Sequence, residues 1–248
     1  MVNRTEYSEG HKMKGSGLSA FLFAFMASCW VSAVVAQDIM SDIPFKPDVE
    51  ARYLFYLHSK LMEQQGIPAS HKKLGDYEFL DILKRLRTEG FNVIAEWRPR
   101  EARLHPYAFR TARRVKGLIE KGVPASSITV AGPDKGGNIA LVVASYVGDP
   151  LVNYVILGGC FSDEMLTESF KEKFELIPAG RILSIQDEGF KKRGSCAPYL
   201  TQAERGTLYQ ETLLSTAEGQ GVFYRPDNRW IEPLRQWAEG GALGSSKN

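Results

Sequence analysis

Short apolar runs alternate with amphipathic segments along residues 52–239 of the chain. The apolar runs have the length of strands, whereas the segments between them carry apolar side chains at helical spacing. The predicted strands are Arg52–Ser59, Phe91–Trp97, Ser127–Gly132, Val152–Gly159, Gly180–Glu188 and Thr207–Leu214, and the predicted helices are Asp76–Gly90, Tyr107–Lys121, Asn138–Val147 and Trp230–Glu239. Because such strands are buried on both faces, the pattern predicts an α/β fold with a mostly parallel central sheet and helices on both faces.

Ligand sites in open parallel sheets lie at the carboxyl ends of the strands. Polar residues at the ends of the predicted strands are therefore the first candidates for a site. His58 and Ser59 end the first strand, Asp134 follows the third, Asp187 lies near the end of the fifth, and Gln220 lies in the loop after the last. These five residues are the candidates for a functional site.

The N-terminal region differs in composition from the rest of the chain. Residues 18–36 read LSAFLFAFMASCWVSAVVA, an apolar run that ends in small residues and follows Lys12 and Lys14. This pattern predicts a signal peptide over residues 1–36, with cleavage before Gln37 and a start at Met13 giving a better-shaped signal. The alternative is an uncleaved membrane anchor, because the run is close to spanning length. We expect a single domain over residues 37–248, exported to the periplasm or the extracellular space, with no membrane span in the mature form.

Cysteine usage agrees with export. Cys29 would leave with the signal peptide, so that the mature chain keeps only Cys160 and Cys196. An even pair of cysteines in an exported protein predicts one disulfide, and the alternative is two separate buried thiols. The predicted bridge would stabilise the fold by ~3–4 kcal/mol.

Charge and metal-ligand spacing exclude several classes of partner. The formal net charge of the chain is +2, which argues against nucleic acid or anionic lipid as a partner. The sequence has neither paired histidines nor a CxxC spacing, so no metal site is predicted, and nothing in it indicates a cofactor. A small molecule or a protein partner remains.

The segment VAGPDKGGNIAL, from Val130 to Leu141, reads as a strand, a tight turn and a helix. A residue on a sharp strand–turn–helix elbow needs small neighbours, and Gly132 and Gly136 lie two positions on either side of Asp134. Gly137 would let the helix pack closely. The alternative is a glycine-rich helix start that binds an anion through free backbone N–H groups.

At these motifs the chain resembles the α/β-hydrolase fold family, and in particular its small exported bacterial members without a large cap domain. The resemblance covers nearly the whole mature chain and rests on YLHSK (Tyr56–Lys60), AGPDKGGNIAL (Ala131–Leu141), SIQDE (Ser184–Glu188) and EGQGVFYRP (Glu218–Pro226). These segments occur in the order that the family has them, and each falls at the end of a predicted strand.

The resemblance also implies a role for each site residue. Asp134 stands where the family has its nucleophilic serine, Asp187 at the acid, and Gln220 at the histidine. His58 and Ser59 stand where the family has the His-Gly that shapes the oxyanion hole. Lys135 is assigned to the pocket, where it neutralises Asp134 or faces solvent.

The two replacements predict a degenerate triad. A serine hydrolase needs a base that takes the hydroxyl proton and returns it to the leaving group. Glutamine does not titrate near neutral pH, so Gln220 holds a geometry but cannot cycle a proton. Loss of the nucleophile and its base removes a factor of about 10⁶ in rate where the effect has been dissected. We therefore expect an inactive or strongly impaired homologue that keeps a pocket for a small molecule or an unknown protein partner.

Other interpretations stay open. In one of them the protein is an active hydrolase. It is then either esterase-like or uses Asp134 as a covalent nucleophile, as dehalogenases and epoxide hydrolases do. That chemistry needs a histidine to activate water, and His58 is the only one near the predicted site, since His71 and His105 read as surface loop. A further interpretation is that Asp134 and Gln220 were introduced to trap a substrate in a formerly active enzyme.

Overall fold

The computed structural model describes residues 39–160, 176–190, 194–200 and 207–241, which belong to one compact unit spanning residues 37–248. The predicted signal peptide lies outside the described residues. Within them, no helix is both long and apolar enough to cross a membrane.

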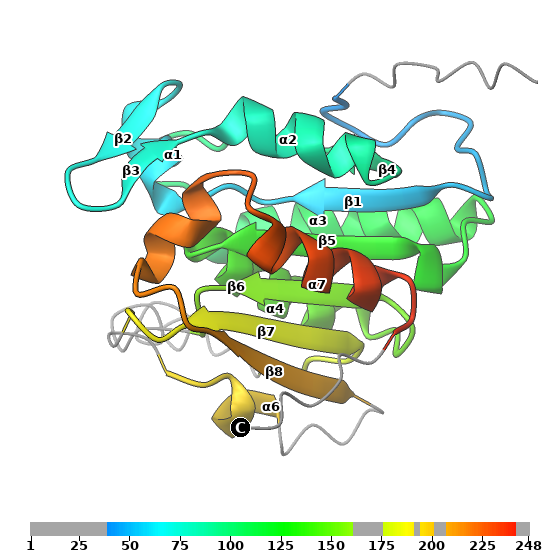
Figure 1. Cartoon of the computed structure of the whole chain (residues 1–248). Helices are drawn as coiled ribbons and strands as arrows, with labels where there is room; N and C mark the ends of the chain where they lie inside the picture. The colour runs from blue at the N-terminus through cyan, green and yellow to red at the C-terminus, as the bar shows by residue number, and fades with distance from the viewer. Residues whose placement is uncertain (1–38, 161–175, 191–193, 201–206, 242–248) are drawn as a thin grey trace, which may run out of the picture. The chain divides into compact units, whose positions relative to one another are not determined.

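The centre of the described structure is a parallel sheet (Figure 1). Six described strands pair in the order β4-β1-β5-β6-β7-β8, and every neighbouring pair is parallel. Their bounds are β1 Arg52–Tyr56, β4 Phe91–Ile94, β5 Ile128–Pro133, β6 Asn153–Leu157, β7 Arg181–Asp187 and β8 Leu208–Leu214. Since all six run in the same direction, their carboxyl ends meet at one edge of the sheet, as the sequence predicts.

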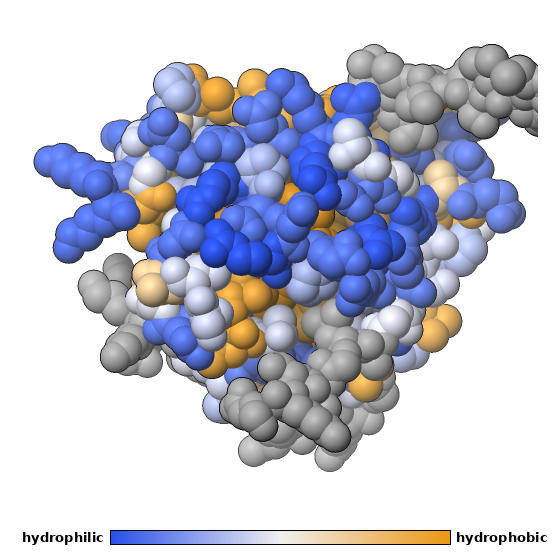
Figure 2. Space-filling model, in the orientation of Figure 1, coloured by the Kyte–Doolittle hydropathy of each residue, from blue (hydrophilic) through white to orange (hydrophobic). Residues whose placement is uncertain are grey.

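Helices cover both faces of this sheet (Figure 1). Helices α3 (Leu104–Glu120) and α4 (Lys135–Val147) pack on one face, and α2 (Phe79–Thr88) and α7 (Asn228–Ala238) pack on the other. In β1, successive side chains enter opposite layers of the core: Tyr53 contributes to the α3–α4 side and Leu54 to the α2–α7 side. This two-sided burial explains why the strands read as continuous apolar runs. The outer surface over α2 and α7 is mainly hydrophilic (Figure 2).

Smaller elements complete the described structure. They are α1 (Lys60–Gln65), the hairpin of β2 (Ala69–His71) and β3 (Gly75–Tyr77), the 3₁₀ turns η1 (Ala125–Ser127) and η2 (Gly219–Tyr224), and α6 (Ala197–Leu200). The sequence does not predict the hairpin or α1.

The main elements agree with the sequence prediction, but the end of β1 and the place of His105 differ from it. Strand β1 ends at Tyr56, so that His58 and Ser59 lie beyond it. The assignment of His105 to a surface loop is wrong, because His105 is buried in the first turn of α3. Pro106 gives that segment the look of a loop, but proline is tolerated in the first turn of a helix.

The predicted disulfide is confirmed. Cys160 and Cys196 are bridged at a sequence separation of 36 residues. Cys160 lies three residues after β6 and Cys196 directly precedes α6, so the bridge ties the carboxyl edge of the sheet to the segment between β7 and β8.

Candidate functional site

Asp134 occupies the turn between β5 and α4 in a backbone conformation that non-glycine residues seldom adopt. Its φ is 55° and its ψ is −124°, and a side chain other than hydrogen is strained at such a positive φ. The Asp134 N–H donates a hydrogen bond of 3.2 Å to the Leu157 carbonyl at the end of the neighbouring β6. The elbow geometry that the sequence predicts is therefore present.

The glycines around Asp134 are required by close packing. A Cβ atom on Gly132 would lie 2.2 Å from the Leu57 carbonyl oxygen, and one on Gly136 would lie 1.8 Å from the same oxygen. A Cβ on Gly137 would lie 2.8 Å from the carbonyl oxygen of Gly132. Real Cβ atoms do not come so close to a backbone oxygen. The chain beyond β1 thus passes directly over the elbow. This close contact explains why glycine is needed at positions 132 and 136 of the motif.

The carboxylate of Asp134 meets the start of α1. Its Oδ2 accepts a hydrogen bond of 3.1 Å from the Lys60 N–H. Ser59 is the N-cap of the same helix, since its Oγ accepts a bond of 3.0 Å from the Leu61 N–H. Ser59 therefore acts as a helix cap. The Lys60 N–H, a backbone donor at this edge of the sheet, is already bound by the Asp134 carboxylate.

His58 is fully buried, and both of its ring nitrogens contact the main chain. Nε2 accepts a bond of 2.8 Å from the Arg98 N–H, which places the proton on Nδ1, 2.9 Å from the Ser59 carbonyl oxygen. Burial, and next the nearby charge of Arg98, lower the pKa of His58 to about 3. The ring is therefore neutral near pH 7 and joins two loops of the carboxyl edge.

A buried ion cluster lies beside His58. The Glu63 carboxylate accepts from Arg98 Nε at 2.7 Å and from Lys135 Nζ at 2.7 Å. The side chains of Glu63, Arg98 and Lys135 are 1%, 2% and 9% exposed. Lys135 also donates to the Ala102 carbonyl oxygen. The alternative in which Lys135 faces solvent is wrong, because Lys135 is buried and Glu63 on α1 supplies its counter-charge.

Sequence reasoning did not single out Glu63 and Arg98. Both stand in charged stretches, LMEQQ and WRPR, that have the composition of a solvated surface. The contact between them joins residues 35 positions apart. No local spacing rule reports such a pairing, so the sequence offers no signal for it.

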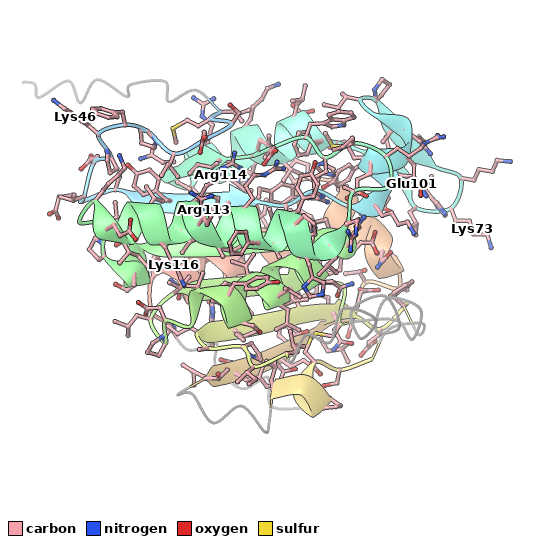
Figure 3. All side chains as sticks on the ribbon, turned by 180° about the vertical axis from the view of Figure 1, so that it is seen from behind. Lys46, Lys73, Glu101, Arg113, Arg114 and Lys116 are labelled. Carbon is pink, nitrogen blue, oxygen red and sulfur yellow. A yellow bond between two sulfur atoms is a disulfide. The ribbon has the colours of Figure 1, made fainter. Side chains whose placement is uncertain are left out.

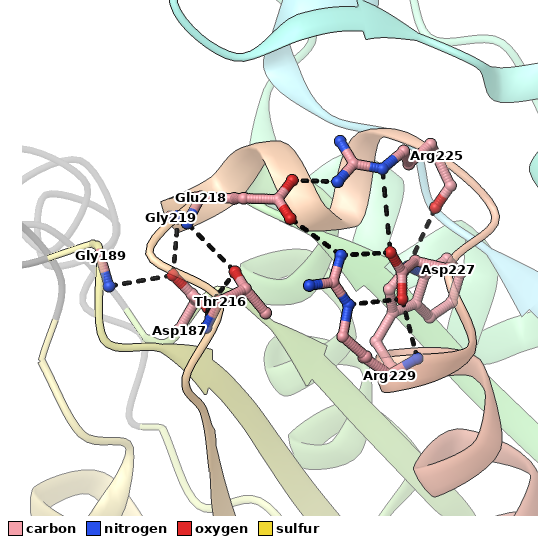
Figure 4. Close-up of polar contacts among 9 residues, drawn as sticks. Asp187, Gly189, Thr216, Glu218, Gly219, Arg225, Asp227 and Arg229 are labelled. Atoms are coloured by element: carbon pink, nitrogen blue, oxygen red, sulfur yellow. Dashed lines mark hydrogen bonds and ion pairs between the residues drawn. The ribbon is translucent and has the colours of Figure 1, made fainter.

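Asp187, at the end of β7, is buried and binds the loops around it (Figure 4). Oδ1 accepts from the N–H groups of Gly189 at 2.9 Å and Gly219 at 2.7 Å, while Oδ2 accepts from the N–H of Thr216 at 3.0 Å and from its hydroxyl. Burial alone would raise the pKa of Asp187, but the hydrogen bonds from Thr216, Gly189 and Gly219 together hold that pKa below its usual value. The carboxylate therefore fixes the approach to η2.

A second set of charges links the residues that precede and follow η2 (Figure 4). Glu218 pairs with Arg225 and with Arg229, the latter at 2.9 Å, and Arg229 also pairs with Asp227 at 2.5 Å. These groups are partly exposed, so each pair is worth little alone. Together with Asp187 they fix the turn that carries Gln220.

Gln220 is 9% exposed, and its Nε2 is buried without a hydrogen-bond partner among the described residues. A Cβ on Gly158, just after β6, would lie 3.3 Å from that nitrogen. Since β6 neighbours β5, the Gln220 amide lies at the same edge of the sheet as the elbow. An unpaired buried donor is costly, so the amide is suited to a ligand or water acceptor.

A pocket of about 500 Å³ adjoins the elbow. Its lining comes from α1, from the loop after β4 and from the first residue of α4, and it includes Lys60, Gln64, Arg100, Glu101 and Lys135. In the part of the chain that the structure describes, no group of three or more histidine, cysteine or acidic side chains could hold a metal ion.

No protein-family model matches the chain, and no curated protein does. Among solved structures, a 2,6-dihydroxy-pseudo-oxynicotine hydrolase gives a TM-score of 0.50 at 14% identity, over 83% of this chain and 66% of that chain. An S-formylglutathione hydrolase from Agrobacterium tumefaciens gives 0.49 at 10% identity, over 78% and 85% of the two chains. An esterase from Pyrobaculum calidifontis gives 0.45 at 17% identity, over 79% and 78%. At such identities the likeness concerns the fold alone. The parallel sheet, the elbow after β5 and the likeness to the 2,6-dihydroxy-pseudo-oxynicotine hydrolase together show that this protein has an α/β-hydrolase fold.

Proposed function

We propose that the protein is a non-catalytic homologue of the α/β-hydrolases that binds a small molecule or a partner at the strand ends. The observation that carries this proposal is that Gln220, which the family resemblance assigns to the position of the catalytic base, brings an amide to the same edge of the sheet as the elbow. An amide neither accepts nor releases a proton near neutral pH, so no group there can activate a nucleophile or a water molecule.

The surroundings of Asp134 support the same proposal. Its carboxylate already binds the Lys60 N–H, a backbone donor at the edge where a reacting oxygen would need one. The Asp187 carboxylate accepts four hydrogen bonds, all from loop groups: the N–H groups of Gly189 and Gly219 and the N–H and hydroxyl of Thr216. His58, the alternative base, is neutral, buried and bound through both ring nitrogens. Asp134, Asp187 and His58 thus each have a structural task, whereas the Gln220 amide keeps an unpaired donor in the described structure.

The test is restoration of the triad. We expect purified wild-type protein to hydrolyse short-chain and long-chain p-nitrophenyl esters no faster than buffer alone does. The double variant Asp134→Ser/Gln220→His gains turnover, whereas each single variant stays near background, because a nucleophile without its base is nearly as poor as neither. Recovery by one change alone would show that the two positions do not act together.

The competing function, a hydrolase with Asp134 as covalent nucleophile, predicts a different result. Wild-type protein would then react with alkyl halides or epoxides, and peptide mass mapping would find the adduct on Asp134. The variant Asp134→Asn, which keeps the size of the side chain, is the matched control. A clear rate in the wild type that disappears in Asp134→Asn would overturn the non-catalytic proposal.

We also propose that the protein is exported and loses residues 1–36. The Cys160–Cys196 disulfide is compatible with an oxidising compartment. Edman sequencing or intact mass of the protein recovered from the periplasm or medium of an expressing cell would show a mature chain that begins at Gln37. A membrane-bound product that retains the segment would contradict export by cleavage.

A further inference from the structure

The pocket beside the elbow has the position and the size of a small-molecule site. Ligands of open α/β sheets bind outside the carboxyl ends of the strands, and the volume of about 500 Å³ lies within the usual range for such sites. Its lining is polar throughout except for Ala102, whose carbonyl oxygen accepts from Lys135. A lining of this kind recognises a ligand through charges and hydrogen bonds.

Two cations at this pocket have no acidic partner among the described residues. Lys60 and Arg100 are both exposed and come from different segments, α1 and the loop after β4. The Arg100 guanidinium donates a hydrogen bond of 3.1 Å to the Gln64 carbonyl oxygen. A guanidinium and an ammonium that face one pocket are the pair of donors that carboxylates and phosphates bind.

The buried charges behind the pocket add to its positive potential. Glu63 is shared between Arg98 and Lys135, so this cluster holds one carboxylate against two cations. The neutral His58 contributes no charge to it. Asp134 partly offsets the excess, but its carboxylate is bound by the Lys60 N–H.

One carboxylate in the lining is also unpaired within the described structure. Glu101, which Figure 3 labels, is an exposed lining residue. Its φ of 62° is a strained value of the kind that collects at ligand clamps. It supplies an acceptor in the same lining as Lys60 and Arg100. The lining therefore suits a ligand that carries an anionic group together with a hydroxyl or an ammonium group.

We propose that this pocket binds a small polar anion, whose carboxylate or phosphate lies between Lys60 and Arg100 and whose hydroxyl or ammonium group donates to Glu101. The inference rests on the proposed binding function and names its ligand class. The shared chemistry is the anionic oxygen group, and the experiment separates carboxylate from phosphate.

The test uses the full chain in low-salt buffer and follows backbone amide shifts by NMR during titration. The probes are succinate, L-serine, inorganic phosphate and O-phosphoserine, with succinamide as the uncharged analogue of succinate. We expect the four probes that carry a carboxylate or a phosphate to bind, and succinamide to bind at least about tenfold more weakly than succinate. The variants Lys60→Gln and Arg100→Gln each weaken the anions by about tenfold. The variant Glu101→Gln weakens O-phosphoserine more than inorganic phosphate.

Matched controls remove a positive charge elsewhere. The control variants are Arg113→Gln and Lys116→Gln. Both residues are exposed on α3 (Figure 3) and do not line the pocket. They should leave every affinity unchanged. The larger affinity, for the phosphates or for the carboxylates, identifies the anionic group. Absence of anion binding, equal binding of succinamide, or equal binding by Lys60→Gln/Arg100→Gln and the wild type would overturn the proposal.

The ester assay keeps the two proposals apart. A protein that binds these anions but hydrolyses esters would refute the non-catalytic function and leave the ligand class standing. An inactive protein that binds none of the anions would refute the ligand class and leave the non-catalytic function standing.

Discussion

His58 illustrates how a residue type associated with catalysis serves a structural purpose. Its ring lies between the Arg98 N–H and the Ser59 carbonyl oxygen and is fully buried. The sequence places a histidine at a strand end, where either a base or a hydrogen-bonding role fits. The structure shows the hydrogen-bonding role. Because the buried ring is neutral, the stability of the protein should depend on pH.

We expect His58 to make the protein less stable in acid. Its pKa falls from 6.5 to about 3 on folding, so below pH 6.5 the unfolded chain binds a proton that the folded chain does not. The free energy of unfolding therefore decreases as the pH is lowered from 6.5 to 3. Between pH 7 and pH 5 the decrease is about 2 kcal/mol. Urea unfolding of the wild type and of His58→Gln at the two pH values measures this difference.

The variant His71→Gln is the control, because His71 is exposed in the β2–β3 hairpin. It should keep the wild-type slope. An identical pH dependence in His58→Gln and the wild type would contradict the assignment to His58.

The glycine at position 136 gives a second prediction at this scale. In Gly136→Ala the added Cβ would lie 1.8 Å from the Leu57 carbonyl oxygen. Backbone on both sides prevents relaxation, so we expect a loss of about 3 kcal/mol in the free energy of unfolding, measured by urea denaturation. Gly194→Ala, where no atom lies within 4 Å of the new Cβ, should differ little from the wild type.

Among the elements, η2 depends on the loop contacts of Asp187. Asp187→Ala leaves the N–H groups of Gly189, Thr216 and Gly219 without their acceptor. We expect a loss of about 2–4 kcal/mol in stability and faster hydrogen exchange at Gly219, read by mass spectrometry.

Asp81→Ala is the matched control for that variant, since Asp81 forms an exposed pair with Lys84 on α2. Its loss should cost less than about 1 kcal/mol. If Asp187→Ala proved no more harmful than Asp81→Ala, the carboxylate would not be what fixes η2.

The alternation of strands and helices was predictable because continuous burial leaves continuous apolar runs, as in Asn153–Leu157, and one-sided burial leaves helical spacing, as in Phe79–Thr88. The β2–β3 hairpin was not predictable, since three-residue polar strands carry neither signature. Helix ends were less accurate than helix cores: α4 begins at Lys135, within glycines that have low helix propensity.

The candidate site was only partly predictable, for a related reason. Motif order led to Asp134, Asp187 and Gln220, because the elbow and the strand ends are local features of the sequence. The partners that decide what these groups do are remote. Glu63 and Lys135 are 72 residues apart, and Asp187 and Gly219 are 32 apart. Such contacts depend on how strands are ordered in the sheet, which local pattern does not encode.

At the scale of the whole molecule, the disulfide limits the freedom of the unfolded chain. It closes a loop at a separation of 36 residues, and we expect it to contribute about 3–4 kcal/mol to stability. Chemical denaturation with and without a reducing agent measures the effect. Cys160→Ala and Cys196→Ala should each lose the same amount and become insensitive to the reductant.

Mass spectrometry of alkylated protein complements this measurement. Protein taken from an oxidising compartment should show neither Cys160 nor Cys196 labelled before reduction and both labelled after it. Two labelled thiols before reduction would contradict the bridge in that compartment.

The buried cluster of Glu63, Arg98 and Lys135 also has a kinetic consequence. Its three charges come from α1, from the segment after β4 and from α4, so the cluster can form only when β1, β4 and β5 are already side by side. We expect the cluster to be completed only after the transition state for folding, because all three strands must first be in register. The cluster should therefore act on the unfolding rate rather than on the folding rate, and so lengthen the lifetime of the native state.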